Sequence, residues 1–218
     1  MIVKPKVRGF ICTTAHPVGC EAVVKSEIEY VKSRKAEDNG FKPKKVLVLG
    51  SSMGYGLASR IALAYSCGAA TLGVMFDRPA SGSKTGTSGW YNTKAFEKFA
   101  QADGLYAKTV NGDAYSDECK KEVIDIIKAD LGKVDAVVYS LAAPRRTVGD
   151  VTYSSVLKTT GEPYTNKTID LRNNTVSEVT IEPATEEEIA ATVKVMGGED
   201  WAAWIDALKA ADAIEDNA

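Results

Sequence analysis

The stretch Val46-Leu47-Val48-Leu49-Gly50-Ser51-Ser52-Met53-Gly54-Tyr55-Gly56 decides the fold class. Its first four residues are all apolar, which is typical of a strand buried on both faces of a parallel sheet. Gly50, Gly54 and Gly56 follow in a G-x-x-x-G-x-G spacing, and the apolar pattern from Leu57 to Ser66 predicts a helix. The stretch therefore predicts a strand, a glycine-rich turn and a helix in direct succession.

The same alternation continues along the chain. Further strands are predicted at 70–76, 105–110 and 134–140, and helices at about 93–102 and 117–131. Strands that alternate with helices imply right-handed crossovers and a parallel sheet covered on both sides. We expect an α/β protein with a Rossmann-like, doubly wound parallel sheet.

The whole chain, residues 1–218, is predicted to form one Rossmann-like domain in four parts. These parts are a lead-in over 1–44, a βαβ core over 45–144, an insertion of hairpins and loops over 145–183, and a helical tail over 184–218. The lead-in is expected to hold a turn at 16–19 and a helix at 21–35. In the tail, a capping-box pattern that begins at Thr185 marks a helix to about Val195, and a second helix follows from Glu199 to about Ala211.

Composition excludes several classes of protein. Apolar residues make up 44% of the chain and the formal net charge is −2, so no broad basic surface indicates a nucleic-acid partner. No apolar run approaches the roughly 18 residues that a membrane span requires. The N-terminus lacks an apolar signal-peptide region, and the four cysteines are scattered like free thiols. We expect a cytoplasmic protein without a metal site.

The glycine-rich turn has the chemistry of a phosphate-binding loop. A pyrophosphate requires close approach of the backbone, which side chains would block, and it is stabilised by the free N–H groups at a helix N-terminus. Glycines also serve tight turns that bind nothing, so position matters. Here Gly50, Gly54 and Gly56 lie between an apolar strand and a helix, which favours nucleotide binding.

Two acidic residues follow the next two strands. Asp77 can accept hydrogen bonds from adenosine ribose hydroxyls and would repel a 2′-phosphate, which favours NADH over NADPH, although Arg78 beside it could pair with such a phosphate. Asp113 could accept from the adenine amino group. The alternatives are a surface acid at Asp77 and an acid near a helix N-terminus at Asp113. The lone histidine, His16, is interpreted as structural rather than catalytic.

The chain resembles the bacterial NADH-dependent trans-2-enoyl-CoA reductase family, which includes an enoyl-acyl-carrier-protein reductase branch. The similarity runs from Met1 to about Leu208 through separate motifs in one order. These motifs lie at 1–5, 15–20, 46–50, 54–60, 89–92, 113–114, 139–142 and 195–201.

The resemblance implies a cofactor and a reaction. Members reduce the C2=C3 double bond of an enoyl-CoA or enoyl-acyl-carrier-protein thioester with NADH, in fatty acid synthesis. The family commonly has glutamate where this chain has Asp77. The implied cofactor contacts are Gly50, Ser51, Ser52, Met53, Gly54, Tyr55, Phe76, Asp77, Asp113, Ala114, Leu141 and Ala142.

The resemblance also implies that the catalytic residues lie beyond Ala218. The family's pair is a tyrosine followed, after eight intervening residues, by a lysine, and neither Tyr139 nor Tyr153 has a lysine at that spacing. We therefore expect the isolated chain to bind NADH and to be inactive. The alternatives are a truncated, non-catalytic nucleotide-binding protein and a short-chain dehydrogenase acting on alcohols or ketones. The second is disfavoured because no Tyr-x-x-x-Lys follows the fourth predicted strand.

Overall fold

The computed structural model describes residues 3–8, 11–34 and 40–218, and these residues divide into two compact units. The first unit holds residue 3 and residues 14–34, 40–141 and 204–218. The second holds residues 4–8, 11–13 and 142–203.

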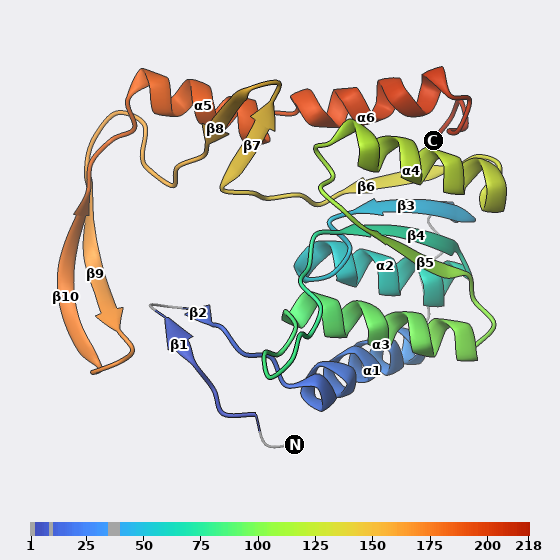
Figure 1. Cartoon of the computed structure of the whole chain (residues 1–218), viewed down its shortest axis with the longest axis horizontal. Coiled ribbons are helices and arrows are strands. Elements are labelled where there is room, and N and C mark those ends of the chain that lie inside the picture. The colour runs from blue at the N-terminus through green and yellow to red at the C-terminus, as the bar shows by residue number, and fades with distance from the viewer. Residues whose placement is uncertain (1–2, 9–10, 35–39) are drawn as a thin grey trace. The chain divides into compact units, whose positions relative to one another are not determined.

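A four-stranded parallel sheet forms the centre of the first unit (Figure 1). Its strands are β3 (Lys45–Leu49), β4 (Ala70–Met75), β5 (Ala107–Asn111) and β6 (Ala136–Tyr139), and they lie in the order β5-β4-β3-β6. All three neighbouring pairs are parallel. Residues 46–49 are fully buried, as the apolar run predicts. The chain thus enters the sheet at β3 and builds outward, first to β4 and β5 and then to β6.

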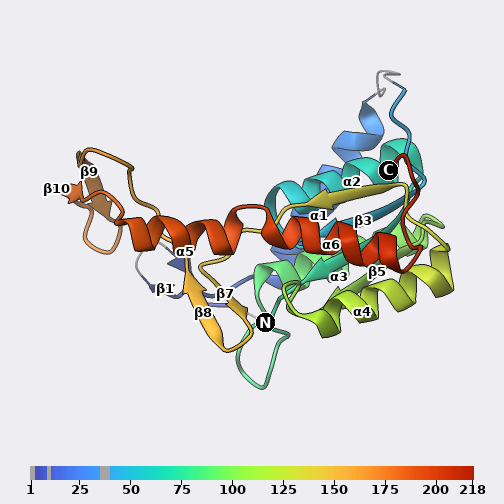
Figure 2. The same cartoon turned by 90° about the horizontal axis from the view of Figure 1, so that it is seen from above.

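Helices cover both faces of this sheet (Figure 1). On one face lie α1 (Pro17–Ser33), α2 (Gly54–Cys67) and α3 (Ser88–Ala102). On the other lie α4 (Asp117–Ile126), its π-helical continuation η1 (Ile127–Leu131), and the end of α6 (Glu199–Ala210), which Figure 2 shows from above. The doubly wound α/β prediction is confirmed.

Alternating side chains of β3 contribute to two hydrophobic clusters. Leu47 and Leu49 pack in the cluster that contains Trp204 and Leu208 of α6, whereas Val46 and Val48 pack with Ala69. This alternation follows from the period of two along a strand. A separate cluster joins α1, α2 and α3. It contains Val24, Ile28, Leu57, Ile61, Ala95 and Phe96.

Several elements begin or end a few residues from their predicted limits. Helix α1 begins at Pro17 rather than at residue 21, because His16 caps it: the Nδ1 atom accepts from the Gly19 N–H at 3.1 Å. Helix α2 begins at Gly54 and α3 at Ser88, both earlier than their apolar patterns. The end predicted for the first helix, residue 35, lies outside the described residues.

The second unit consists of hairpins and helices. Hairpins β7 (Arg145–Val148) with β8 (Val151–Ser154) and β9 (Tyr164–Asp170) with β10 (Thr175–Ile181) are antiparallel. They confirm the predicted hairpin insertion. Helix α5 (Glu186–Met196) follows with the predicted capping box between Thr185 and Glu188. Strands β1 (Val7–Arg8) and β2 (Ile11–Cys12) form a short pair in this unit.

Candidate functional site

The candidate site lies at the carboxyl ends of the four parallel strands. After β3 the chain continues to β4 on one side, whereas the last strand, β6, lies on the other side of β3. In open α/β sheets, ligands bind outside the carboxyl ends at such a reversal of strand order. The glycine-rich turn leaves β3 at this point.

The turn is packed so closely that two glycines are required. A Cβ on Gly50, which has φ +80°, would lie 2.1 Å from the Ser140 carbonyl oxygen at the end of β6. A Cβ on Gly56 would lie 2.0 Å from the Gly50 carbonyl oxygen. The Gly50 and Ser51 N–H groups both donate to the Val74 carbonyl, at 3.0 and 2.9 Å. The turn is therefore fixed to β4 and to β6 at once.

The N-terminus of α2 is free of the groups that usually cap a helix. Its N-cap residue is Met53, whose side chain makes no capping hydrogen bond, and the first turn contains no acidic residue. Gly54 has φ +54°, and a Cβ there would meet nothing within 4 Å. The first N–H groups of a helix lack intrahelical partners and carry the positive end of its dipole. This terminus can hold an anion such as a pyrophosphate.

Asp77 is held from two sides just beyond the end of β4. Its main-chain N–H donates to Asn111 Oδ1 at 2.9 Å, and Asn111 Nδ2 donates to its carbonyl at 2.8 Å. Its carboxylate accepts from the Thr87 hydroxyl, which donates to Oδ1 at 2.6 Å. A half-buried carboxylate at this edge can also accept from a ribose hydroxyl.

The loop after β5 is held in place by side chains of α4 and α6. Asp113 is exposed, and its Oδ1 accepts from the Tyr115 N–H at 3.0 Å. The Ala114 carbonyl accepts from Trp204 Nε1 at 3.0 Å and from Lys120 Nζ at 3.2 Å. The Lys120 ammonium also lies 5.3 Å from the centre of the Trp204 ring. A buried lysine and a buried tryptophan therefore fix a loop whose acidic side chain faces solvent.

The remaining predicted residues are exposed or lie near the end of β6. Met53, Tyr55 and Phe76 are 52%, 88% and 81% exposed, which leaves apolar surface available to a ligand. Leu141 is half-buried, and its Cδ2 atom would lie 3.0 Å from a Cβ on Gly50. Ala142 is the first residue of the second unit in this segment, and it follows Leu141 directly in the chain.

Hydrogen bonds and close packing link the ends of all four strands. Gly50 packs on the end of β6, Ser51 bonds to β4 through its N–H and Oγ, and Asp77 is bonded to Asn111 of β5. The predicted residues at 50–55, 76–77, 113–114 and 141 therefore lie along one edge of one sheet. The assignment of individual contacts to a cofactor remains a prediction.

Sequence reasoning missed the supporting residues Thr87, Asn92, Asn111, Lys120 and Trp204. Asn92 donates from Nδ2 to the Ser52 carbonyl at 3.3 Å and so ties α3 to the glycine-rich turn. Asn111 directly follows a predicted strand and Lys120 lies within a predicted helix, and no local pattern marks either residue. The motif Gly89-Trp90-Tyr91-Asn92 was a sequence signal for the first turn of α3.

A buried cation lies beneath this edge. Arg60 of α2 is fully buried and is hydrogen-bonded entirely to neutral oxygens. Its guanidinium donates to the Thr109 hydroxyl at 2.8 Å and to the Lys108 carbonyl at 2.7 Å. Burial lowers the pKa of Arg60 to about 10, because desolvation disfavours the charged form. These bonds join α2 to β5 and, through Thr71, to β4.

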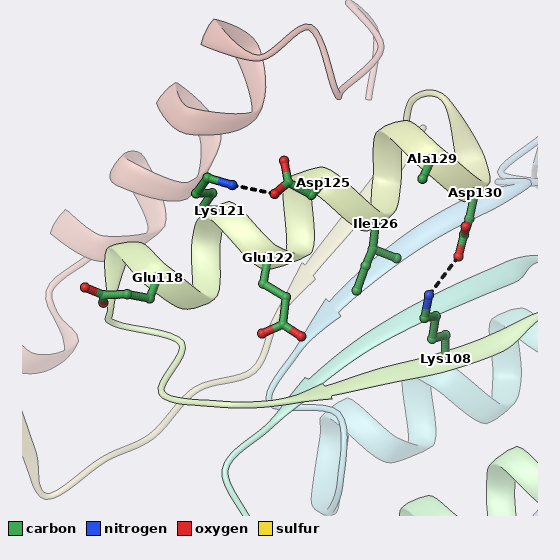
Figure 3. Close-up of a pocket in the computed structure, with 8 residues that line it drawn as sticks. All are labelled: Lys108, Glu118, Lys121, Glu122, Asp125, Ile126, Ala129 and Asp130. Atoms are coloured by element: carbon green, nitrogen blue, oxygen red, sulfur yellow. Dashed lines mark hydrogen bonds and ion pairs between the residues drawn. The ribbon is translucent and has the colours of Figure 1, made fainter.

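A shallow cavity of about 460 Å³ lies elsewhere, between α4, η1 and strand β5 (Figure 3). Ion pairs join Lys121 to Asp125 and Lys108 to Asp130 along its wall. It is lined by Lys108, Glu118, Lys121, Glu122, Asp125, Ile126, Ala129 and Asp130. None of these is a predicted cofactor contact, so the candidate site is an open edge rather than this cavity.

Other kinds of site find no support in the part of the chain that the structure describes. No group of three or more His, Cys, Asp or Glu side chains there could hold a metal ion. No helix among the described residues is long and apolar enough to cross a bilayer.

Comparisons with known proteins agree with this geometry. Residues 2–82 match the family model described as the NAD(P)H binding domain of trans-2-enoyl-CoA reductase, and residues 84–218 match the model of its catalytic region. A trans-2-enoyl-CoA reductase (NADH) of Ruminiclostridium cellulolyticum is 60% identical over all of this chain and 55% of the relative. An enoyl-[acyl-carrier-protein] reductase (NADH) of Serratia proteamaculans is 58% identical over all of this chain and 54% of the relative.

Solved structures give the same result. The trans-2-enoyl-CoA reductase of Treponema denticola in complex with NAD superposes with a TM-score of 0.93 and 50% identity, covering 99% of this chain and 55% of that one. The enzyme of Clostridium acetobutulicum in complex with NADH also has a TM-score of 0.93, with 41% identity over 100% of this chain and 55% of that one. The chain spans about half the length of the relatives it matches. It belongs to the trans-2-enoyl-CoA reductase family.

Proposed function

We propose that this chain forms the NADH-binding part of an enzyme that reduces the C2=C3 double bond of trans-2-enoyl thioesters. The observation that carries the proposal is the glycine-rich turn between β3 and α2. There, side chains are excluded at Gly50 and Gly56 by backbone contacts of 2.1 and 2.0 Å, and the helix terminus is uncapped. Such a turn at the reversal of strand order suits a dinucleotide pyrophosphate.

The proposal gives each part of the edge a role. The backbone N–H groups of residues 50–55 bind the pyrophosphate, and Asp77 accepts from the adenosine ribose. Asp113 and Ala114 border the adenine, with Phe76 as an apolar contact. Leu141 and Ala142 lie beside the nicotinamide ribose. When bound, NADH supplies a hydride to the enoyl thioester.

In this proposal, the residues of this chain bind and orient the cofactor. They do not supply the group that polarises the thioester carbonyl. The tyrosine–lysine pair that the resemblance implies matches no tyrosine and lysine within residues 1–218. Where such a pair is present, it would polarise the thioester carbonyl and stabilise the enolate. The carrier of the acyl group, coenzyme A or acyl carrier protein, is part of the proposal, as are the role in fatty acid synthesis and the cytoplasmic location.

Fluorescence titration of the purified chain with NADH, and separately with NADPH, tests the proposal. We expect saturable NADH binding and much weaker NADPH binding, since the Asp77 carboxylate would repel a 2′-phosphate. With a trans-2-enoyl-CoA substrate added, NADH absorbance should decline no faster than in a protein-free blank. Absence of binding to either nucleotide would refute the cofactor assignment for this chain.

A further inference from the structure

The first turn of α3 controls how the Asp77 carboxylate is oriented. We infer that Thr87 is a positioning residue that fixes this carboxylate and thereby sets the preference for NADH over NADPH. The inference rests on the proposed function, because it concerns the same edge of the sheet. That edge, formed by the carboxyl ends of the four parallel strands, is termed the cofactor edge.

The Thr87 hydroxyl does not perform the task usual for its position. Thr87 is the N-cap residue of α3, with extended backbone at φ −70° and ψ 158°, yet its side chain makes no capping hydrogen bond. A threonine there ordinarily accepts from an N–H in the first turn. Instead, its hydroxyl lies 2.6 Å from Asp77 Oδ1 and donates to it. The hydroxyl also lies 3.4 Å from the Arg78 carbonyl oxygen, so its short contact is the one to the carboxylate.

Gly89 makes room for the same carboxylate. A Cβ at residue 89 would lie 2.5 Å from both Asp77 carboxylate oxygens, so any other residue would displace the carboxylate. The Asn111 side chain also bonds to both the N–H and the carbonyl of Asp77. The backbone and the side chain of Asp77 are thus both held in place.

This arrangement leaves one carboxylate oxygen for a ligand. Oδ1 is occupied by Thr87, and among the described residues no donor is bonded to Oδ2. A fixed carboxylate presents Oδ2 to ribose hydroxyls and keeps a negative charge where a 2′-phosphate would lie. A carboxylate freed from Thr87 could rotate away, and the exposed Arg78 next to it could then pair with that phosphate.

The test compares three variants in titrations with NADH and NADPH. For Thr87→Val we expect the ratio of the NADPH to the NADH dissociation constant to fall about tenfold, which is the factor expected for loss of a hydrogen bond to a charged group. Thr87→Ser keeps the hydroxyl and should retain the wild-type ratio. Thr185→Val removes the hydroxyl that caps α5 in the second unit, so it should lower the unfolding temperature and leave the ratio unchanged.

Gly89→Ala provides an independent variant if Thr87→Val does not fold. It displaces the carboxylate while the hydroxyl remains, and the ratio should fall in the same way. A purely structural role for Thr87 predicts a lower unfolding temperature with an unchanged ratio, and that result would overturn the inference. Failure of the wild-type chain to bind either nucleotide would instead overturn the proposed function, so the two failures are distinct.

Discussion

At the scale of single residues, the glycines of the turn differ in what they require. Gly54 needs freedom of φ but has open space around it, whereas Gly56 is limited by packing against a carbonyl oxygen 2.0 Å from the position of a Cβ. Alanine is favoured over glycine within a helix by up to about 1 kcal/mol. A loss of stability at residue 56 would therefore report the close backbone approach rather than helix propensity.

We expect Gly56→Ala to lower the free energy of unfolding by about 3 kcal/mol, because the Gly50 backbone cannot move without disturbing its bond to Val74. NADH binding should also weaken at least tenfold. Chemical denaturation and the NADH titration measure the two effects. The matched control is Gly68→Ala, at a left-handed position with no atom within 4 Å, which should cost about 1 kcal/mol and leave NADH affinity intact. Equal NADH affinity in the two variants would contradict this account.

The part of the candidate site that neighbouring residues determine was predictable from the sequence. The run 46–49 and the spacing of Gly50, Gly54 and Gly56 give strand, turn and helix from neighbouring residues. The bond between Thr87 and Asp77 crosses a loop, and that between Trp204 and the Ala114 carbonyl crosses 90 residues. Neither leaves a periodic pattern, so the groups that position the two acids had to come from the structure.

At the scale of elements, Arg60 connects one helix to two strands. Its guanidinium reaches Thr71 of β4 and Thr109 of β5, and it lies 4.6 Å from the centre of the Phe96 ring of α3. A lysine carries the charge but not the planar fork, so it cannot satisfy these acceptors together.

Arg60→Lys should therefore lower the free energy of unfolding by about 2 kcal/mol, since buried acceptors lose their donors. The same substitution at Arg172, which pairs with Asp170 on the exposed β9–β10 hairpin, should change it by less than about 0.5 kcal/mol. Urea denaturation of both variants makes the comparison. A loss at Arg172 as large as that at Arg60 would contradict the role assigned to burial.

The helix boundaries also belong to this scale. Apolar periodicity placed α3 from residue 93, whereas the structure begins it at Ser88. The first turn of α3 faces the cofactor edge rather than the core, with Thr87 bonded to Asp77 and Asn92 bonded to the Ser52 carbonyl. A hydrophobic pattern marks only the part of a helix that packs on other elements, so it misses a turn whose contacts are polar.

At the scale of the whole molecule, the sheet has a strand at its edge with apolar side chains that are only partly covered. Strand β6 pairs with β3, and its residues Val137, Val138 and Tyr139 are half-buried. An unpaired strand edge with apolar neighbours favours association between chains. We expect this chain to associate as its concentration rises. Sedimentation velocity over a concentration series checks this, and a constant monomer sedimentation coefficient would contradict it.

The two-way bond between Asn111 and Asp77 has a consequence for the chemical ageing of this protein. Asn111 precedes Gly112, and an asparagine before glycine is prone to deamidation, in which the next main-chain nitrogen attacks the side-chain amide. In the folded chain that amide holds the backbone of Asp77, and the Gly112 N–H is bonded to the Met75 carbonyl at 2.9 Å. Both reacting groups are thus occupied while the ends of β4 and β5 stay closed. The rate at which Asn111 deamidates in the folded protein is then set by how often these strand ends open.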